Sequence, residues 1–294
     1  MWEHGQTVIR DEQVRRCFPR RAADSHKGTY GQVLAVCGSY GMAGAAGLAA
    51  RGALRCGAGL VTLAVPQSIY PILASTLLEA VFLPLPETPA GQLGLVSLQR
   101  LRERLPRATS LLIGPGMGQN GEMGELVFRL LEAAACPAVV DADGLNAVAP
   151  HIDRLKTVHA PLVLTPHPGE MASLMGCTVE EVQRRRVATA REAAARTGAV
   201  VVLKGHGTVV AAPGRETLLN PTGTPGMATG GSGDVLAGMV ASFLAQGMPP
   251  EDAAMCGVYL HGLAGERAAA KLSQHGMLPT DLLAELPGLF LDYE

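Results

Sequence analysis

A regular alternation of two kinds of segment constrains the fold more than any other feature of the sequence. Short apolar runs rich in β-branched residues alternate with alanine-rich stretches whose apolar residues recur at helical spacing. This alternation predicts a mostly parallel β-sheet with helices on both faces, because continuous apolar strands are covered on both sides. No low-complexity linker, internal repeat or break in composition divides the sequence. We therefore expect a single α/β domain over residues 1–294.

The expected strands are Gln32 to Cys37, Leu60 to Val65, Ala80 to Leu83, Ser110 to Ile113, Ala138 to Asp141, Leu162 to Thr165 and Val200 to Leu203. The expected helices are Ala45 to Cys56, Leu95 to Leu105, Glu122 to Ala135, Thr178 to Thr197, Val235 to Gln246 and Glu251 to Leu272. Two further runs, Thr208 to Ala212 and Glu216 to Leu219, flank a Pro-Gly pair and predict an antiparallel hairpin after the last parallel strand.

Composition narrows the possible functions. Hydrophobic residues make up 48% of the chain and charged residues 17%, as in a compact enzyme. The net charge of -2 and the aromatic content of 4% give no reason to expect nucleic acid or an anionic membrane as a partner. The six cysteines form no CxxC pair, the first residues are polar, and no apolar run approaches the roughly 20 residues of a membrane span. We therefore expect a soluble cytoplasmic protein with reduced thiols.

The segments that follow five of the expected strands carry glycine, charge or histidine, whereas the other strand ends are ordinary. These segments are residues 38–45, 114–118, 141–146, 165–170 and 204–208. In parallel α/β sheets, ligands bind beyond the carboxyl ends of the strands. The sequence therefore predicts a ligand site at that edge of the sheet.

A glycine-rich segment from Asn220 to Asp234 leads directly into one of the expected helices. The amides of Gly231 to Gly233 at a helix N-terminus suit a phosphate, because unpaired N–H groups and the helix dipole both face it. Asp234 beside that phosphate suits a base that takes a proton from a hydroxyl during phosphoryl transfer. The alternative is that Asp234 only caps the helix and that the glycines form turns.

Three other groups of polar residues each allow two interpretations. Lys204 and the residues up to Thr208 suit a nucleotide's phosphates or ribose, or they form a turn with a surface lysine. His167 lies between two prolines and is expected to point into the site rather than to decorate the surface. Glu170 contacts a water of a phosphate-bound magnesium ion, or it opens the following helix.

Two aspartates, Asp141 and Asp143, follow one strand so closely that they are not assigned separately. One lines the site, and the other caps the short helix that contains Asn146. In the segment from Gly114 to Gly116, the absence of side chains suits a bulky ligand, although it is also good turn chemistry.

Several common site types are missing from the sequence. The spacing of Gly38, Gly41 and Gly44 is not the GxGxxG of a Rossmann fingerprint, and no acidic residue ends the next strand to hold a ribose. There is no Walker A sequence. A Ser/His/Asp signature, an HExxH motif and a cysteine flanked by cations are also missing, which disfavours hydrolytic and zinc mechanisms.

Five motifs occur in a recognisable order, within a match that covers nearly the whole chain from about Lys27 to the helix around His261. They are Lys27 to Gly31, Gly114 to Gly118, Thr165 to Glu170, Lys204 to Thr208 and Asn220 to Asp234. Their order resembles that of the ADP-dependent (S)-NAD(P)H-hydrate dehydratases, which are relatives of the ribokinase-like small-molecule kinases. The resemblance implies a ribokinase-like three-layer sandwich with a mostly parallel central sheet.

The resemblance also implies an activity, the repair of NADH and NADPH that carry water at position 6 of the nicotinamide. ADP (or ATP) and Mg²⁺ would drive phosphorylation of the 6-hydroxyl, and phosphate would then leave more readily than hydroxide. By resemblance, Asp234 is the base and contacts the hydrate. Further contacts to the hydrated dinucleotide would come from Ala45, Gly116 and His167. The implied adenine-nucleotide site comprises Lys204, Gly205, His206, Gly207, Thr208 and Gly233.

Two other functions are considered. One is an ATP-dependent kinase for a small alcohol of the thiamine or pyridoxine precursor type; such kinases tend to carry Asn-x-x-Glu where this chain has His167 to Glu170, which favours the dehydratase. The other is a catalytically silent nucleotide sensor, and the retention of Asp234 counts against it.

The chain leaves no room for the epimerase domain fused to many dehydratases, so it resembles the stand-alone form, whose members suggest a homo-oligomer. With the usual pKa of about 3.9, Asp234 would be a weak base.

Overall fold

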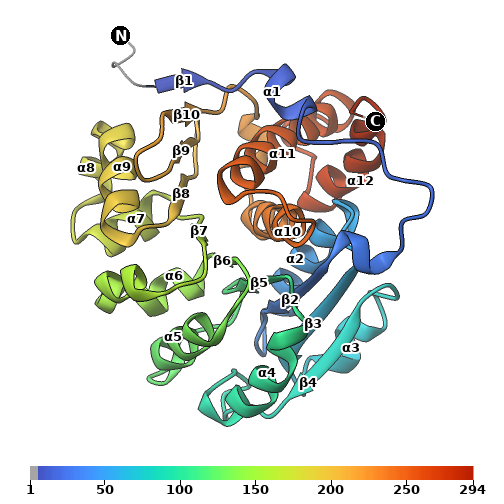
Figure 1. The fold of residues 1–294 in the computed structure, drawn as a ribbon, viewed down its shortest axis with the longest axis vertical. Coiled ribbons are helices and arrows are strands. Elements are labelled where there is room, and N and C mark those ends of the chain that lie inside the picture. The colour runs from blue at the N-terminus through green and yellow to red at the C-terminus, as the bar shows by residue number, and fades with distance from the viewer. Residues whose placement is uncertain (1–5, 294) are drawn as a thin grey trace.

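One ten-stranded sheet forms the centre of the molecule in the computed structural model, which describes residues 6–293 (Figure 1). The strand order is β1-β10-β9-β8-β7-β6-β5-β2-β3-β4. Every pair from β8 through β2 to β4 is parallel, as predicted. The predicted hairpin is also confirmed, because β9 pairs antiparallel with both β8 and β10, and β1 then adds a parallel edge strand. Residues 1–5 and 294 of the expected domain lie outside the described residues.

The strands are β1 (Gln6–Val8), β2 (Gln32–Val36), β3 (Leu60–Pro66), β4 (Val81–Leu85), β5 (Ser110–Ile113), β6 (Ala138–Val140), β7 (Leu162–Leu164), β8 (Val200–Leu203), β9 (Val209–Ala211) and β10 (Thr217–Leu219). The α-helices are α1 (Asp11–Arg15), α2 (Ala43–Arg55), α3 (Tyr70–Ala74), α4 (Leu98–Arg104), α5 (Met123–Ala133), α6 (Asp143–Val148), α7 (Pro168–Met175), α8 (Val179–Arg184), α9 (Arg186–Thr197), α10 (Ser232–Ala245), α11 (Pro250–Leu272) and α12 (Pro279–Phe290). Short 3₁₀ turns are η1 (Lys27–Tyr30), η2 (Leu95–Ser97), η3 (Leu105–Arg107), η4 (Ala149–Thr157) and η5 (Pro225–Met227).

One expected helix is wrong as a continuous element. The run from Thr178 to Thr197 is broken at Arg185, whose φ of -128° and ψ of 39° are not helical. The first part starts with a capping box between Thr178 and Glu181, and α9 begins anew at Arg186. Arg186, the first residue of α9, donates hydrogen bonds to the carbonyls of Leu203 and Lys204 at the end of β8. The break in the helix therefore places the Arg186 side chain at the edge of the sheet.

The core lies in two layers, one on each face of the sheet. Successive residues of β2 alternate between them: Val33 and Ala35 join one cluster, and Leu34 and Val36 join the other. Helices α2, α10, α11 and α12 cover the first face, and α4, α5, α6, α7 and α9 cover the second (Figure 1). The three-layer arrangement predicted from the resemblance is therefore present.

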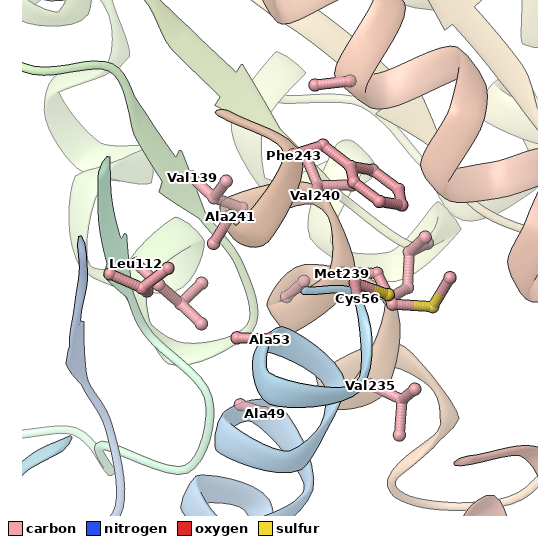
Figure 2. Close-up of a cluster of buried hydrophobic side chains, with 14 of the residues drawn as sticks. Ala49, Ala53, Cys56, Leu112, Val139, Val235, Met239, Val240, Ala241 and Phe243 are labelled. Atoms are coloured by element: carbon pink, nitrogen blue, oxygen red, sulfur yellow. The ribbon is translucent and has the colours of Figure 1, made fainter. Parts of the chain in front are cut away.

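Helix α10 is held very close to α2 by glycines on both helices. A Cβ at Gly238 would come within 2.0 Å of the Ala49 carbonyl oxygen, and one at Gly52 within 2.5 Å of the Val235 carbonyl oxygen. Figure 2 shows small residues of α2, such as Ala53, beneath α10. Since no side chain separates the two backbones, the axis of α10 is fixed relative to the sheet, and so is the place where the helix begins.

The five polar strand ends predicted from the sequence belong to five consecutive strands of the sheet, β8, β7, β6, β5 and β2. These strands are mutually parallel, so their carboxyl ends share one edge. Within residues 6–293, no helix is both long enough and apolar enough to cross a bilayer.

Candidate active site

The loops at this edge are joined to one another by hydrogen bonds. The amide of Gly38 donates to the Pro115 carbonyl at 2.8 Å, and the Ser39 hydroxyl donates to the Gly116 carbonyl at 2.8 Å. On the other side of the site, the Lys204 amide donates to the Pro166 carbonyl at 2.8 Å. The predicted convergence of these loops is therefore confirmed. The Lys27–Gly31 motif instead precedes β2 and lies at the opposite end of the strands.

The start of α10 places Asp234 in the first turn of the helix, as expected. The N-cap residue is Gly231, with φ of 101°, and it provides no capping side chain. Asp234 is the third helical residue, and its carboxylate accepts no hydrogen bond that we find among residues 6–293. Capping therefore does not account for Asp234. The Ser232 amide donates to the Thr229 carbonyl at 3.4 Å, so the amides of Gly231 and Gly233 are the ones open to an anion.

The carboxylate of Asp234 is a stronger base than the sequence suggests. Burial, and after it the negative charge of Asp141, raise its pKa to about 7 against the opposing effect of the Lys204 ammonium. The raised pKa makes Asp234 a stronger base than an unperturbed Asp, whose pKa is about 3.9. The pKa shift arises from the tertiary structure, because it depends on partial burial of Asp234 near another carboxylate. A base with a pKa near neutral is well matched to accepting a proton at physiological pH.

A buried ion pair lies next to Asp234. The Lys204 ammonium is 2.7 Å from Asp141 Oδ1 and 3.8 Å from Glu170 Oε2, and its side chain is only 18% exposed. The Thr165 hydroxyl donates to the same Asp141 oxygen at 2.7 Å. Burial by itself lowers the pKa of Lys204, but the neighbouring carboxylates outweigh it and raise the pKa overall. Lys204 is therefore a charged group of the site, and the alternative of a surface lysine is wrong.

Lys204 also lies directly against the anion-binding turn of α10. A Cβ at Gly233 would be 3.3 Å from Lys204 Nζ. The turn and the ammonium thus face the same space, with Asp234 one residue further along the helix. A phosphate bound there would meet backbone amides on one side and a cation on the other.

The two aspartates after β6 have different roles. Asp141 is 1% exposed and forms the ion pair with Lys204, so it lines the site. The carboxylate of Asp143 accepts a hydrogen bond from the amide of Gly118 at 2.8 Å and so holds that loop. The sequence predicts that one of the two aspartates caps helix α6, but Asp143 makes no capping hydrogen bond. Ala142 between them has φ of 49°, an unfavourable conformation for alanine.

His167 and Glu170 form the capping box of α7. His167 Nδ1 accepts the amides of Gly169 and Glu170 at 3.0 and 3.2 Å, and the carboxylate of Glu170 accepts the His167 amide at 2.7 Å. The His167 ring remains 55% exposed, and its Nε2 is 3.2 Å from the other oxygen of Glu170. Burial raises the pKa of Glu170, although nearby Lys204 opposes the shift. Glu170 thus both opens its helix and borders the Lys204 cluster.

Ala45 and Gly116 are in direct contact across the two loops. A Cβ at Gly116 would lie 2.8 Å from Ala45 Cβ and 3.0 Å from the Met42 carbonyl oxygen, and Gly116 has φ of 64°. This position therefore requires glycine for both space and backbone conformation.

The resemblance implies that Gly116 contacts the hydrated dinucleotide; on that expectation, Gly116→Ala should raise the KM for it about 10-fold or more, because Ala45 must move to admit the methyl group. The left-handed backbone adds a stability loss of about 1–2 kcal/mol. Steady-state kinetics and urea unfolding measure the two effects. Gly121→Ala is the matched control, since its Cβ would meet nothing within 4 Å. Equal effects at both positions would refute the proposed contact.

The loop from Lys204 to Thr208 is shaped by two glycines with positive φ, 134° at Gly205 and 62° at Gly207. The Thr208 hydroxyl closes it by donating to the Gly205 carbonyl at 2.8 Å, and His206 is exposed at its tip. The loop leaves backbone groups open to a ligand, and its part in nucleotide binding remains a proposal.

Sequence reasoning missed two residues that support the site. Arg186 donates to the Leu203 and Lys204 carbonyls at 3.0 and 3.2 Å and so fixes the start of the Lys204 loop. His261 contacts the first residue of α10 from within α11. Both come from helices distant in the sequence, and neither stands in a motif that points to chemistry.

The chain is similar to known proteins along almost its whole length. A model of the NAD(P)H-hydrate dehydratase family matches residues 33–288. A bifunctional NAD(P)H-hydrate repair enzyme of Moorella thermoacetica is 50% identical over 277 residues, which cover 94% of this chain and 52% of that protein. An ADP-dependent (S)-NAD(P)H-hydrate dehydratase of Bacillus subtilis is 37% identical, with 97% and 98% of the two chains covered. The chain thus spans about half the length of the bifunctional relatives.

Two solved structures agree with the fold. The ADP/ATP-dependent NAD(P)H-hydrate dehydratase of B. subtilis, co-crystallised with ATP and Mg²⁺, matches with a TM-score of 0.85 at 34% identity and covers 98% of each chain. A ribokinase-like superfamily protein of Enterococcus faecalis matches with a TM-score of 0.86 at 26% identity, covering 100% of this chain and 98% of that one.

Proposed function

Because this chain belongs to the NAD(P)H-hydrate dehydratase family, we propose that it dehydrates (6S)-hydrated NADH and NADPH with ADP or ATP as co-substrate. The relative from B. subtilis carries that activity in its name. The observation that best supports the proposal is Asp234, a half-buried carboxylate with a pKa of about 7 that caps no helix and lies at a helix start beside Lys204. We propose that residues 1–294 act as one catalytic unit.

The proposed reaction has two stages. The 6-hydroxyl oxygen attacks the terminal phosphorus of ADP, its proton passes to Asp234, and AMP leaves. The lone pair of the nicotinamide ring nitrogen then expels phosphate by breaking the C6–O bond. Loss of a proton from C5 restores the dihydropyridine. Phosphate leaves more readily than hydroxide, since its conjugate acid has a pKa of about 6 against 15.7 for water.

The residues around Asp234 suit the first stage. The open amides of Gly231 and Gly233 and the Lys204 ammonium would stabilise the charge that develops on the transferred phosphoryl group. Contacts of Ala45, Gly116 and His167 with the dinucleotide would bring its 6-hydroxyl to Asp234. The nucleotide would lie along the Lys204–Thr208 loop and Gly233.

The side chains at the site suit a magnesium ion that is bound through water rather than by direct ligands. Within residues 6–293, no three His, Cys, Asp or Glu side chains are grouped to hold a metal. Both carboxylate oxygens of Glu170 are engaged with His167. We propose that Glu170 contacts the ion through water, while the nucleotide's phosphates hold it. Magnesium bound in this way would neutralise phosphate charge.

A kinase for a vitamin-type alcohol is the competing function, and a specific experiment separates the two. Hydroxyethylthiazole kinase of Pyrococcus horikoshii matches with a TM-score of 0.60 at 17% identity, which supports a shared fold alone. Phosphorus NMR of a reaction with ADP and hydrated NADH should show AMP and inorganic phosphate in equal amounts. A stable phosphorylated alcohol as the product would favour the kinase instead.

The activity should depend on pH through Asp234. A base must be ionised to accept a proton, so kcat/KM for the hydrate should fall about tenfold per pH unit below a pH of about 7 and level off above it. If Asp234 had its ordinary pKa, the fall would begin near pH 4. Rates measured from pH 5.5 to 8.5 decide between them. A flat profile across this range would contradict the raised pKa.

Two further properties are proposed for the intact protein. All six cysteines are free thiols, which supports a cytoplasmic location.

We also propose a homo-oligomer, supported by exposed apolar residues near the β4 edge of the sheet, including Ile72 at 60% and Leu78 at 85% exposure. Light scattering during size-exclusion chromatography measures the molar mass, and a monomer at micromolar concentration would refute it.

A further inference from the structure

Helix α11 runs alongside the segment that leads to Asp234 and binds it at several points. The Asn220 amide group donates to the Val258 carbonyl at 3.1 Å, and the Thr222 hydroxyl donates to the Tyr259 carbonyl at 2.9 Å. Further along the helix, the carboxylate of Glu266 accepts the Gly223 amide at 2.8 Å. The segment from Asn220 is therefore attached to α11 before it reaches the start of α10.

Glycines on α11 allow this close attachment. A Cβ at Gly262 would be 2.1 Å from the Thr222 hydroxyl oxygen, and one at Gly265 would be 2.3 Å from the Met227 sulfur. Because these positions have no side chain, the segment lies directly on the helix backbone.

The last of these attachments is a buried histidine. His261 is 8% exposed, and its Nε2 is 2.9 Å from the Ser232 carbonyl oxygen. A carbonyl only accepts, so Nε2 carries the hydrogen and donates it. Burial lowers the pKa of His261 to about 4, against the opposing effect of the Ser232 bond, so the ring is neutral at physiological pH. Ser232 is the first residue of α10, two positions before Asp234.

The turn that His261 holds has little rigidity of its own. Gly230, Gly231 and Gly233 surround Ser232, and glycine restricts the backbone less than any other residue. No side chain caps the helix start. Packing against α2 fixes where the helix begins, and a bond from outside the turn adds a restraint on the orientation of the Gly231 and Gly233 amides and of Asp234.

We infer that His261 is a positioning residue for the reaction: its Nε2–H bond to the Ser232 carbonyl fixes the first turn of α10 and thereby the anion-binding amides and the Asp234 carboxylate. The expected effect of this bond on kcat rests on the proposed function. The restraint on the turn itself is independent of the reaction.

Two variants of His261 test the bond itself. In His261→Leu the side chain stays large and apolar, but the donor is lost. In His261→Gln, the side-chain amide nitrogen can take the place of Nε2 and donate to Ser232. We expect kcat to fall roughly 10- to 100-fold in the Leu variant, because small misplacements of reacting groups cost that much, with a smaller rise in KM. The Gln variant should recover most of the loss.

Met255→Ala is the control for loss of stability alone. Met255 lies on the same helix, is 5% exposed, and makes none of the contacts to the 220–232 segment described above. We expect it to lower the unfolding midpoint while kcat stays near that of the wild type. If kcat in the Leu variant stays at the wild-type value, or if the Gln variant is as slow as the Leu variant, the positioning role is overturned. An equal loss of kcat in Met255→Ala would also overturn it.

Hydrogen exchange measured by mass spectrometry tests the restraint without any catalysis. Peptides that cover residues 228–236 should exchange faster in His261→Leu than in the wild type, and at the wild-type rate in Met255→Ala. Unchanged exchange in the Leu variant contradicts the inference. This measurement remains decisive even if the wild-type protein fails to dehydrate hydrated NADH, so failure of the inference and failure of the proposed function can be distinguished.

Discussion

Asp234→Asn is expected to lower kcat by up to about 10⁴-fold while leaving ADP affinity almost unchanged. Asn has the shape of Asp but cannot accept the proton of the 6-hydroxyl, and general-base catalysis contributes roughly 10²- to 10⁴-fold. The anion-binding amides and Lys204 remain in place, so the nucleotide should still bind. Steady-state kinetics and calorimetric titration with ADP measure the two quantities. A variant with a tenth or more of the wild-type kcat would show that the base is another residue.

The same substitution should increase stability at high pH. The folded-state pKa of Asp234 is raised from 3.8 to about 7, so its contribution to stability is complete below pH 3.8 and is lost as the pH rises through about 7. Asn carries no charge and avoids this loss. In urea, the free energy of unfolding of Asp234→Asn should therefore exceed that of the wild type at pH 8, and this difference should shrink toward pH 5. Glu192→Gln, at an exposed ion pair with Arg185, controls for the loss of a carboxylate and should show no such gain.

Lys204→Met is expected to have the second large effect, because it leaves Asp141 and Glu170 without their cation. Removal of one partner from a buried ion pair typically costs about 3–5 kcal/mol. We also expect the nucleotide KM to rise strongly, since the ammonium that faces the turn at Gly233 is lost. The pKa of Asp234 should rise further, so the remaining activity should shift to higher pH.

Urea unfolding at two pH values tests the electrostatic part of this prediction. At pH 5, the raised pKa values of Glu170 and Asp234 leave these carboxyls more protonated, so the stability deficit of Lys204→Met should be smaller than at pH 7.5. Lys271→Met is the matched control, because this lysine is 66% exposed in its pair with Glu285 and should cost less than about 1 kcal/mol. Equal losses in the two variants would contradict the role of Lys204.

The edge that carries the site could be predicted from the sequence, since it depends on local signals. Continuous apolar runs marked the strands, and each polar segment followed a strand directly. The neighbour relations could not be predicted in the same way, because the order β8-β7-β6-β5-β2 is set by pairing between distant segments. Asp141 and Lys204 are 63 residues apart and meet only because β7 pairs with both β6 and β8 and so brings their carboxyl ends together. That pairing decided which of the two aspartates lines the site.

Properties that depend on burial were the least predictable. The raised pKa of Asp234 requires a desolvated position beside Asp141, which no local pattern reveals. His261 stands among apolar residues in the middle of a 23-residue helix, where a histidine gives no functional signal. The break at Arg185 falls within a run of three arginines that contains neither glycine nor proline.

Recovery of the dihydropyridine tests the central claim most directly. The protein is mixed with (6S)-hydrated NADH, ADP and Mg²⁺, and the absorbance of restored NADH is followed. We predict a full rise with one AMP formed per NADH, no rise without nucleotide, and almost none with Asp234→Asn. No rise with the wild-type protein, together with ATP-dependent phosphorylation of a thiamine or pyridoxine precursor alcohol, would contradict the proposed function.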